Sequence, residues 1–474
     1  MGSCVQSSGI MSKKVFLIRL SRPSYELTVV PPLGIMYLAS ALRTWGGHLV
    51  ALYDMKVEGD SIEKATKKAF EFGPDVVGLS LMSFEAPVLT KLAASIKKAL
   101  PKSLIIAGGP HPSTFPQDIA YEPDIDLFVL GEGEMAATSI LERLENGAGF
   151  DDIEGTAIRV DGQVKITPRK SFIKDLDRIP MPAWDLIPLK KYFDMPRMGN
   201  IYKYKEFMPI FTSRSCPFQC VYCHKIFGKG FRPRSPESVL EEIKFLNQQY
   251  HIREFMIMDD CFNLQKSRAH EILSRISSSD MDICLRFPNG MRADILDHDL
   301  IIALKEAHTF ATCVAVETAT PRLQKMIKKN LDLDKVFNTI ELTDKFNIMT
   351  HGFFMIGFPT ETREEMLTTI DYAVRSKLHS AAIFRVTPFK GTELYQMALD
   401  MGYQVADDPD SFEIYKTHIN LSAVPEKDVT KLQNLFYRRF YFSPTRQLRF
   451  LKLMPNKMDT IPRLAKIFVS RAFR

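Results

Sequence analysis

Arg214-Ser-Cys-Pro-Phe-Gln-Cys-Val-Tyr-Cys-His224 is the segment from which most of this chain can be predicted. It holds three closely spaced cysteines, Cys216, Cys220 and Cys223. Thiolates at such short spacings can bind three irons of a 4Fe–4S cluster. No fourth cysteine stands close by in the sequence, so the fourth iron would be open to a small molecule. We therefore predict a cluster that does chemistry on a bound molecule rather than one that only relays electrons.

Zinc and disulfide interpretations of the same cysteines are weaker. A zinc site could use the three cysteines and His224, but zinc sites usually draw two separated ligand pairs, and the adjacent Cys223 and His224 would have to converge on one ion. Disulfides are disfavoured because seven cysteines is an odd number and no secretory signal is visible. These features predict a reduced, cytoplasmic protein.

The spacing Cys-x-x-x-Cys-x-aromatic-Cys resembles the signature of the radical S-adenosylmethionine (radical SAM) family, with Tyr222 at the aromatic position. The resemblance implies that the open iron binds the amino and carboxylate groups of SAM. It also implies that the reduced cluster cleaves SAM to a 5′-deoxyadenosyl radical, which requires an external electron donor.

The composition allows several domains and argues against some partners. At 474 residues, two to four domains are expected, and a hydrophobic content of 45% is ample for large cores. The net charge of +6 is modest for this length and does not argue for nucleic acid. No run of about 18 apolar residues is present, so we expect no membrane span.

Residues 13–150 alternate short apolar runs with amphipathic stretches. The predicted strands are Val15–Leu20, Leu49–Tyr53, Val76–Ser80, Leu104–Ala107 and Leu127–Leu130. The predicted helices are Leu33–Trp45, Ser61–Phe72, Ala86–Leu100 and a stretch near Phe115–Ala120. This alternation predicts a doubly wound parallel sheet, which binds ligands at the carboxyl ends of its strands.

Small residues follow several of these predicted strands. They include Gly34, Ser80, the pair Gly108-Gly109 and the run that starts at Gly131. No G-x-G-x-x-G or Walker loop is present, so dinucleotide and nucleoside triphosphate sites are poorly supported. The glycines could also be ordinary turns.

Together these segments resemble the cobalamin-binding domain that precedes many radical SAM domains. In the usual motif, Asp-x-His-x-x-Gly, the histidine is the lower cobalt ligand. Here the matching segment is Asp54-Met-Lys56-Val-Glu-Gly59, in which a lysine replaces that histidine. A protonated lysine has no lone pair for cobalt, so we expect no histidine below the metal. The cobalamin contacts that the resemblance implies are Leu33, Gly34, Asp54, Ser80, Gly108, Gly109, His111, Gly131 and Glu132. For His111, a surface loop position is the alternative.

Residues 151–205 are predicted to be a linker that contains a hairpin. Thr156–Val160 and Val164–Thr167 flank Asp161-Gly162, which is a favoured two-residue turn. The proline-rich run Ile179–Pro188 follows and predicts a stiff connector, where we place the domain boundary.

Residues 206–395 return to alternating strands and helices. The predicted strands are Met208–Thr212, Glu254–Met258, Ile283–Phe287, Thr312–Glu317, Thr350–Ile356 and Ala381–Val386. The predicted helices are Pro236–Gln249, Lys266–Ser278, Asp299–His308, Asp334–Phe346 and Thr362–Ser376. Six β–α units predict a partial (β/α)6 TIM-like barrel, with its active site at the carboxyl ends of the strands.

Polar residues fall at the ends of these predicted strands. By resemblance to the radical SAM family, the SAM contacts are Tyr222, Asp259, Asp260, Arg292 and Glu317. The fixed fork of Arg292 suits the SAM carboxylate.

Alternatives stay open for several polar residues of this region. Arg292 could form a structural salt bridge with Asp294, and Glu317 could be a satisfied buried acid. His351 is either a group that acts on the substrate or a structural histidine. The isolated thiols are expected to be inert core groups; they are Cys261, Cys284 and Cys313.

Residues 396–474 have helical patterning. From Arg446 to Arg474 there are eight Lys or Arg and one acid, Asp459, interleaved with apolar residues. Such a segment could lie on an anionic membrane surface or could cap the barrel with a solvated basic face. Peripheral membrane contact through residues 446–474 therefore stays open.

We interpret the chain as α/β, with a cobalamin-binding Rossmann-like domain at residues 13–150, the linker, a radical SAM partial barrel and a helical C-terminal region. The resemblance implies methyl transfer from methylcobalamin to an unactivated carbon of a small-molecule or lipid-like substrate, with a 4Fe–4S cluster, SAM and cobalamin as cofactors. The alternatives are oxidative cyclisation or rearrangement without methyl transfer, and a cobalamin- or cluster-based sensor without enzymatic activity.

Overall fold

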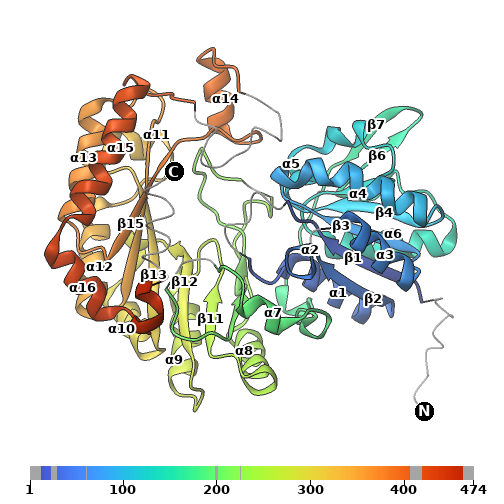
Figure 1. The fold of residues 1–474 in the computed structure, drawn as a ribbon, viewed down its shortest axis with the longest axis horizontal. Helices are drawn as coiled ribbons and strands as arrows, with labels where there is room; N and C mark the ends of the chain where they lie inside the picture. Colours follow the sequence, from blue (N-terminus) through green and yellow to red (C-terminus); the bar gives the residue numbers. More distant parts are fainter. Residues whose placement is uncertain are drawn as a thin grey trace.

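The computed structural model describes residues 12–22, 29–59, 61–197, 201–224, 226–405 and 419–462. The chain forms two α/β lobes that lie side by side and are joined by a connector that contains α7 (Leu189–Phe193) (Figure 1). Each lobe is built around its own sheet.

The first sheet is parallel at its centre. Its parallel strands are β1 (Lys14–Arg19), β2 (Leu49–Asp54), β3 (Val76–Ser80), β4 (Leu104–Gly108) and β5 (Leu127–Val129). They lie in the order β2-β1-β3-β4-β5. In this flavodoxin-like order the strand sequence reverses between β1 and β3, so a ligand crevice is expected at the carboxyl ends of those two strands.

The hairpin belongs to the first sheet and not to the linker where the sequence analysis placed it. It consists of β6 (Thr156–Val160) and β7 (Gln163–Thr167), and β6 pairs antiparallel with β5. Because β5 would otherwise end the sheet with unpaired backbone groups, the hairpin covers this edge. The first lobe therefore extends beyond residue 150.

Helices cover both faces of this sheet. One face packs against α1 (Leu33–Gly46) and α6 (Gly133–Asn146). The other packs against α3 (Ile62–Phe72) and α4 (Ala86–Ala99). The sequence analysis missed α6 because its first residues, Gly-Glu-Met after Gly-Glu, are typical of a turn.

The connector is part of a continuous core. Trp184 and Tyr192 are fully buried in an apolar cluster that includes Leu33 of α1 and Ile210 of the second lobe. The Tyr192 hydroxyl donates a hydrogen bond of 2.5 Å to Asp54 at the end of β2. The two lobes are therefore joined by packing and by a buried polar contact, not only by the chain.

The second sheet has six parallel strands and follows the predicted pattern. They are β8 (Phe207–Ile210), β11 (Glu254–Ile257), β12 (Cys284–Met291), β13 (Thr309–Glu317), β14 (Met349–Ile356) and β15 (Ser380–Arg385). Among the described residues, the outer strands β8 and β15 do not pair, so the barrel stays open. The partial barrel expected from the sequence is confirmed.

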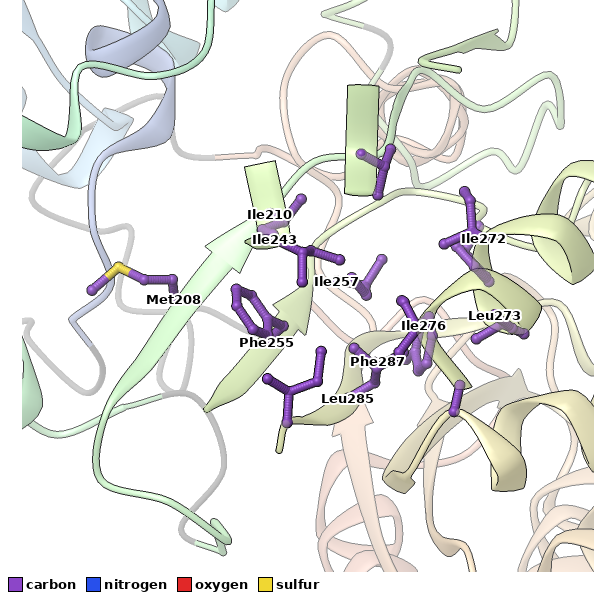
Figure 2. Close-up of a cluster of buried hydrophobic side chains, with 14 of the residues drawn as sticks. Met208, Ile210, Ile243, Phe255, Ile257, Ile272, Leu273, Ile276, Leu285 and Phe287 are labelled. Atoms are coloured by element: carbon purple, nitrogen blue, oxygen red, sulfur yellow. The ribbon is translucent and has the colours of Figure 1, made fainter. Parts of the chain in front are cut away.

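Helices line the outer side of this sheet. They are α8 (Pro236–Tyr250), α9 (Lys266–Ser277), α10 (His298–Glu306), α12 (Leu333–Lys345) and α13 (Arg363–Arg375). The helices α11 (Pro321–Met326) and α14 (Glu393–Asp400) instead pack around Val221 of the cysteine loop. Figure 2 shows Ile272 and Ile276 of α9 beside Leu285 and Phe287 of β12. Burial of such side chains contributes about 1.5–3 kcal/mol each.

The C-terminal helices dock on the barrel. Phe436 of α15 (Glu426–Tyr441) contacts Phe354 of β14 at 5.7 Å between ring centroids. In α16 (Pro444–Leu453), the buried Arg446 donates to the carbonyl oxygens of Val374, in the last turn of α13, and of Leu378, just before β15. The expected helical cap is present, and residues 463–474 of the basic tail lie outside the described residues.

We predict that Tyr192→Phe destabilises the protein by about 1.5–3 kcal/mol, because it removes a buried hydrogen bond to a carboxylate. Thermal unfolding followed by circular dichroism measures the change. The matched control is Tyr204→Phe, whose hydroxyl donates to the exposed Asp282 at 3.2 Å and should matter by less than about 0.5 kcal/mol. Equal effects of the two variants would contradict a special role for the connector contact.

Candidate active site

The three cysteines lie on a loop that is closed at its stem by two short strands. β9 (Ser213–Arg214) pairs antiparallel with β10 (Arg232–Pro233), so that Arg214 lies opposite Arg232. Ser215 has a φ of 71°, an unusual value for a residue with a side chain, and its hydroxyl donates to the Gly228 carbonyl at 2.8 Å. The stem and this bond fix both ends of the loop.

The three thiols of the loop are free and differ in exposure. Cys223 is exposed, whereas Cys216 and Cys220 are half-buried. A hydrogen bond from the buried Cys261 lowers the pKa of Cys216 to about 7. Burial raises the pKa of Cys223 to about 11, and the neighbouring Cys220 and Cys216 act in the same direction. Across the described part of the chain, no three His, Cys, Asp or Glu side chains stand as a metal-holding group, so cluster binding requires these thiols to draw together.

The two adjacent aspartates after β11 have different roles. The buried Asp259 accepts from the backbone N–H and hydroxyl of Thr212 at 2.6 and 2.5 Å and from the Ser213 hydroxyl at 2.5 Å. Its carboxylate therefore holds the start of the loop stem. Asp260 is exposed and lines a cavity between the lobes, so it is the one of the pair that can meet a ligand.

Tyr222 and Glu317 meet on the inner side of the loop. The Tyr222 hydroxyl donates to Glu317 Oε1 at 3.1 Å, and Lys329 Nζ forms an ion pair with the same oxygen at 2.9 Å. Glu317 ends β13 with a φ of 64°, and a residue held in this region often marks a functional site. Burial raises the pKa of Tyr222, with the Glu317 carboxylate acting in the same direction. The sequence analysis missed Lys329.

Arg292 forms the structural salt bridge that was its alternative interpretation. Its Nε lies 2.9 Å from Asp294 Oδ1, and its guanidinium lies 3.8 Å from the ring centroid of Phe218 in the cysteine loop. It also donates to the Asn330 carbonyl at 3.2 Å. Arg292 is thus already engaged at the loop, and a SAM carboxylate would have to share it with Asp294.

A cavity of about 450 Å³ opens at the carboxyl ends of β1 and β3 and extends to the second lobe. Its deep part lies between the first sheet and helices α1 and α6, where Val15, Leu42 and Leu141 line it. Its rim includes Arg214 and Asp260 of the second lobe. The crevice expected from the strand order is therefore present and reaches the cysteine loop.

Most of the residues expected to bind cobalamin line this cavity. They are Leu33, Gly34, Ser80, Gly108, Gly109, Gly131 and Glu132. Gly109 has a φ of 99°, and a Cβ there would lie 2.9 Å from the Leu81 carbonyl oxygen, so only glycine fits this turn.

Asp54 and His111 are the two expected contacts that do not line the cavity. Asp54 is fully buried and is occupied by the Tyr192 hydroxyl, the Arg19 guanidinium at 3.1 Å and the backbone N–H of Lys56 at 2.9 Å. His111 is neither a cavity residue nor a surface one: it is buried against Phe115, and burial lowers its pKa to about 4.

Lys56, which replaces the usual histidine, forms a buried ion pair. Its Nζ lies 2.7 Å from Glu85 Oε1, and both side chains are almost fully buried. Glu85 lines the cavity and also accepts from the Met82 backbone N–H at 2.8 Å. The lysine is thus directed to a carboxylate and not into the cavity.

The loop after β5 is tied to the stem of the cysteine loop. Glu132 Oε1 lies 3.1 Å from Arg214 and 2.7 Å from Arg232, and Glu134 lies 2.7 Å from Arg214. These side chains are at most 10% exposed. Although Glu132 lines the cavity, its carboxylate is taken by the two stem arginines, a contact that sequence reasoning missed.

The inner face of β14 is mostly apolar. Along β14, the residues that face the outer helices are fully buried, and the alternate residues on the other face are half-buried. The half-buried residues of β14 are His351, Phe353 and Met355. His351 Nδ1 lies 2.8 Å from the Ser380 hydroxyl, and burial lowers the histidine's pKa to about 4, so this polar pair is neutral at pH 7.

The structure combines a flavodoxin-like lobe that has a ligand crevice with a partial barrel that carries a three-cysteine loop. This combination is typical of one class of protein, the radical enzymes with an accessory cofactor domain. Comparison with known proteins gives the same division. Residues 27–141 match the family model of the B12 binding domain, and residues 210–373 match that of the Radical SAM superfamily.

Two curated relatives span most of the chain. An uncharacterized methyltransferase of Pyrococcus horikoshii is 31% identical over 423 residues, which cover 88% of this chain and 89% of that protein. Cytidylyl-2-hydroxyethylphosphonate methyltransferase of Streptomyces wedmorensis is 29% identical over 424 residues, 78% of each chain. The chain belongs to the radical SAM enzymes that carry a cobalamin-binding domain.

A solved structure supports the fold. The radical SAM methyltransferase TsrM from Kitasatospora setae, with cobalamin and a 4Fe–4S cluster bound, aligns with a TM-score of 0.69 at 17% identity, over 92% of this chain and 82% of that one. The arrangement of a cobalamin-binding lobe against a partial barrel is therefore shared at low sequence identity.

The residues present fit these cofactors. Three free thiols on one clamped loop are a suitable donor set for a cluster with an open iron. The cavity suits a large flat cofactor because its floor is apolar and its rim carries glycines, and at Gly34 an added Cβ would meet nothing within 4 Å.

Glu361 shapes the loop after β14 and was also missed. Its carboxylate accepts from the backbone N–H groups of Gly357 and Phe358 at 2.6 and 3.0 Å, and the Phe358 ring lies 6.4 Å from that of Tyr222. Burial raises the pKa of Glu361 from 4.5 to about 8. In the folded protein this group therefore holds its proton to a higher pH than in the unfolded chain.

We predict that the wild type loses stability relative to Glu361→Gln as pH rises from about 4.5 to about 8. The contribution of a raised carboxyl pKa is full below the unfolded value and fades above it, by about 1.4 kcal/mol per pH unit. Unfolding midpoints of both proteins across this range measure the effect. Glu365→Gln is the control, because the hydrogen bond from Arg322 lowers the pKa of Glu365, so the contribution of this group changes only below about pH 4.5 and should stay constant across the range. A pH-independent difference between wild type and Glu361→Gln would contradict the prediction.

Proposed function

We propose that this enzyme transfers a methyl group to an unactivated carbon of a small-molecule substrate. When bound, the cluster supplies the electron that cleaves SAM, and cobalamin carries the methyl group. The observation that supports this best is the shared cavity, in which residues of the cobalamin-binding lobe and Asp260 beside the cysteine loop line one space. The protein's part is to hold the cofactors next to each other and to keep water away from them.

We assign the chain's residues as follows. Cys216, Cys220 and Cys223 hold the cluster, and Asp260 meets the amino group of SAM. Glu317, held by Tyr222 and Lys329, presents its remaining carboxylate oxygen to the ribose or methionine part of SAM.

The apolar inner face of β14 supports a substrate whose reacting part is uncharged. On β14 and β15, the neutral pair His351 and Ser380 provides a polar contact among the apolar side chains Phe353, Met355 and Phe384. One relative, the hopanoid C-3 methylase of Methylococcus capsulatus, is named for such a substrate and is 26% identical over 398 residues.

We predict that anaerobic reconstitution with iron, sulfide and hydroxocobalamin gives protein with both a 4Fe–4S signal and corrin absorption bands. Addition of SAM should shift the reduced cluster's EPR signal. Cys220→Ala should lose the cluster signal and keep the corrin bands, because Cys220 is not among the cavity residues. Cys284→Ala is the control, since this buried thiol lies at the start of β12 and should leave both cofactors in place.

The same preparations separate the alternatives. Cluster without corrin would overturn the cobalamin part of the proposal, and no 5′-deoxyadenosine under reducing conditions would favour a sensor. A product that carries label from methyl-labelled SAM would support methyl transfer. Oxidative cyclisation remains the second candidate, because the anaerobic magnesium-protoporphyrin IX monomethyl ester cyclase of Rubrivivax gelatinosus is 26% identical over 375 residues.

We also propose peripheral contact between the C-terminal region and an anionic membrane surface. Phe442, Leu448 and Met458 are 85%, 67% and 90% exposed, and the exposed Lys452 and Lys457 lie among them. None of the helices that the structure describes could span a bilayer. Because Arg446 binds carbonyls that precede β15, α16 lies at the amino end of the barrel strands, opposite the active site. The contact would hold the enzyme at a surface and not deliver substrate.

We predict that the protein floats with vesicles of anionic phosphatidylglycerol and not with neutral phosphatidylcholine vesicles, and that salt weakens the binding. The double variant Leu448→Asp and Met458→Asp should reduce flotation several-fold, because it places charges in the apolar contact. Tyr121→Asp is the control, since Tyr121 is 79% exposed on the first lobe. Absence of flotation of the wild type, or an equal loss in the control, would overturn the membrane contact.

A further inference from the structure

The stem of the cysteine loop is the place where the two lobes share buried charges. Arg214 and Arg232 lie opposite each other in the two-stranded stem, one before and one after the loop. Both reach Glu132 of the first lobe, and Arg214 also reaches Glu134. Arg169, which donates to the Glu132 carbonyl oxygen, lies close to the same two carboxylates, so several cations surround them in a nearly dry interface.

The network has further contacts that tie it to neighbouring elements. Arg214 reaches both carboxylates, through Nη1 to Glu132 and Nη2 to Glu134. Its guanidinium also lies 5.3 Å from the ring centroid of Tyr37 in α1. Glu132 Oε2 accepts the backbone N–H of Ile173 at 3.2 Å. The network thus connects α1, the loop after β5, the connector and the stem at one point.

Both ends of the network adjoin a cofactor site. Arg214 is two residues from Cys216, and Glu132 lies in the segment Gly131–Glu134 that lines the cavity. A shift of Glu132 relative to Arg214 would leave a charge buried without a partner, which is strongly unfavourable. The salt bridges therefore resist sliding of one lobe on the other at the point where the cofactors would meet.

We propose that Arg214 is a positioning residue that, through Glu132 and Glu134, fixes the place of the iron–sulfur cluster relative to the cobalamin. This inference rests on the proposed function, because it assumes that both cofactors bind. The planar fork of arginine is required, since a lysine offers one compact charge and cannot meet both carboxylates in the same way.

The test measures the magnetic interaction between the two cofactors in the reconstituted full-length protein. Reduced cluster and cob(II)alamin are both paramagnetic, and a nearby cluster makes the cobalamin EPR signal relax faster, an effect that falls steeply with distance. In the wild type we expect faster relaxation when the cluster is reduced. Arg214→Met should bind both cofactors and lose most of this enhancement, and Arg214→Lys should lose part of it.

The matched control is Arg43→Met. Arg43 forms an exposed ion pair with Asp185 of the connector at 2.8 Å, so its loss should not change the relaxation. If Arg214→Met does not fold or retain both cofactors, Glu134→Gln removes one arm of the network with a smaller change and should weaken the enhancement several-fold.

The outcomes separate this inference from the proposed function. Failure of the wild type to bind cobalamin or the cluster would overturn the proposed function. Both cofactors bound in the wild type without faster relaxation would contradict their closeness and so the proposed function as well. Faster relaxation in the wild type that is unchanged in Arg214→Met and Glu134→Gln would overturn the positioning role alone.

Discussion

A buried carboxylate, Glu132, determines how the two lobes of this protein meet. A carboxylate that is 1% exposed is stable only if cations and donors surround it, and here the stem arginines Arg214 and Arg232 provide them. The same two arginines close the cysteine loop. The ion pairs that stabilise the buried Glu132 carboxylate therefore connect the loop, the cavity rim and the lobe interface. The apolar cluster that includes Trp184 and Tyr192 adds area, but it does not fix the register in this way.

The rest of the site follows from a general property of parallel sheets. Strands of one direction end at the same edge, so loops far apart in the sequence meet there. In this protein the carboxyl ends of β1, β3 and β4 supply the cavity rim, and those of β8, β11 and β13 supply the stem, Asp260 and Glu317. Placing two such edges against each other creates a single reaction space from two separate folds.

The sequence predicted the parts that depend on local pattern. All six barrel strands could be located because each is a short apolar run between amphipathic helices. The glycines around the cavity could be found because they stand near the ends of predicted strands, and at Gly109 and Gly131 a positive φ favours glycine. Asp54 and His111 do not line the cavity, because neither a motif nor a position after a strand fixes the direction of a side chain. Lys329, Glu361 and the arginine network were missed because their partners lie far away in the sequence, and only the tertiary fold brings them together.

Lys56 stands where the usual cobalamin motif has its histidine, and the segment around Lys56 has structural contacts instead. Asp54 still caps a short helix, but its carboxylate now holds Tyr192 of the connector and Arg19. Lys56 is paired with Glu85, which lines the cavity, so the lysine side chain is directed to a carboxylate. The segment that binds metal in the usual motif has become part of the structure that holds the connector and the cavity wall.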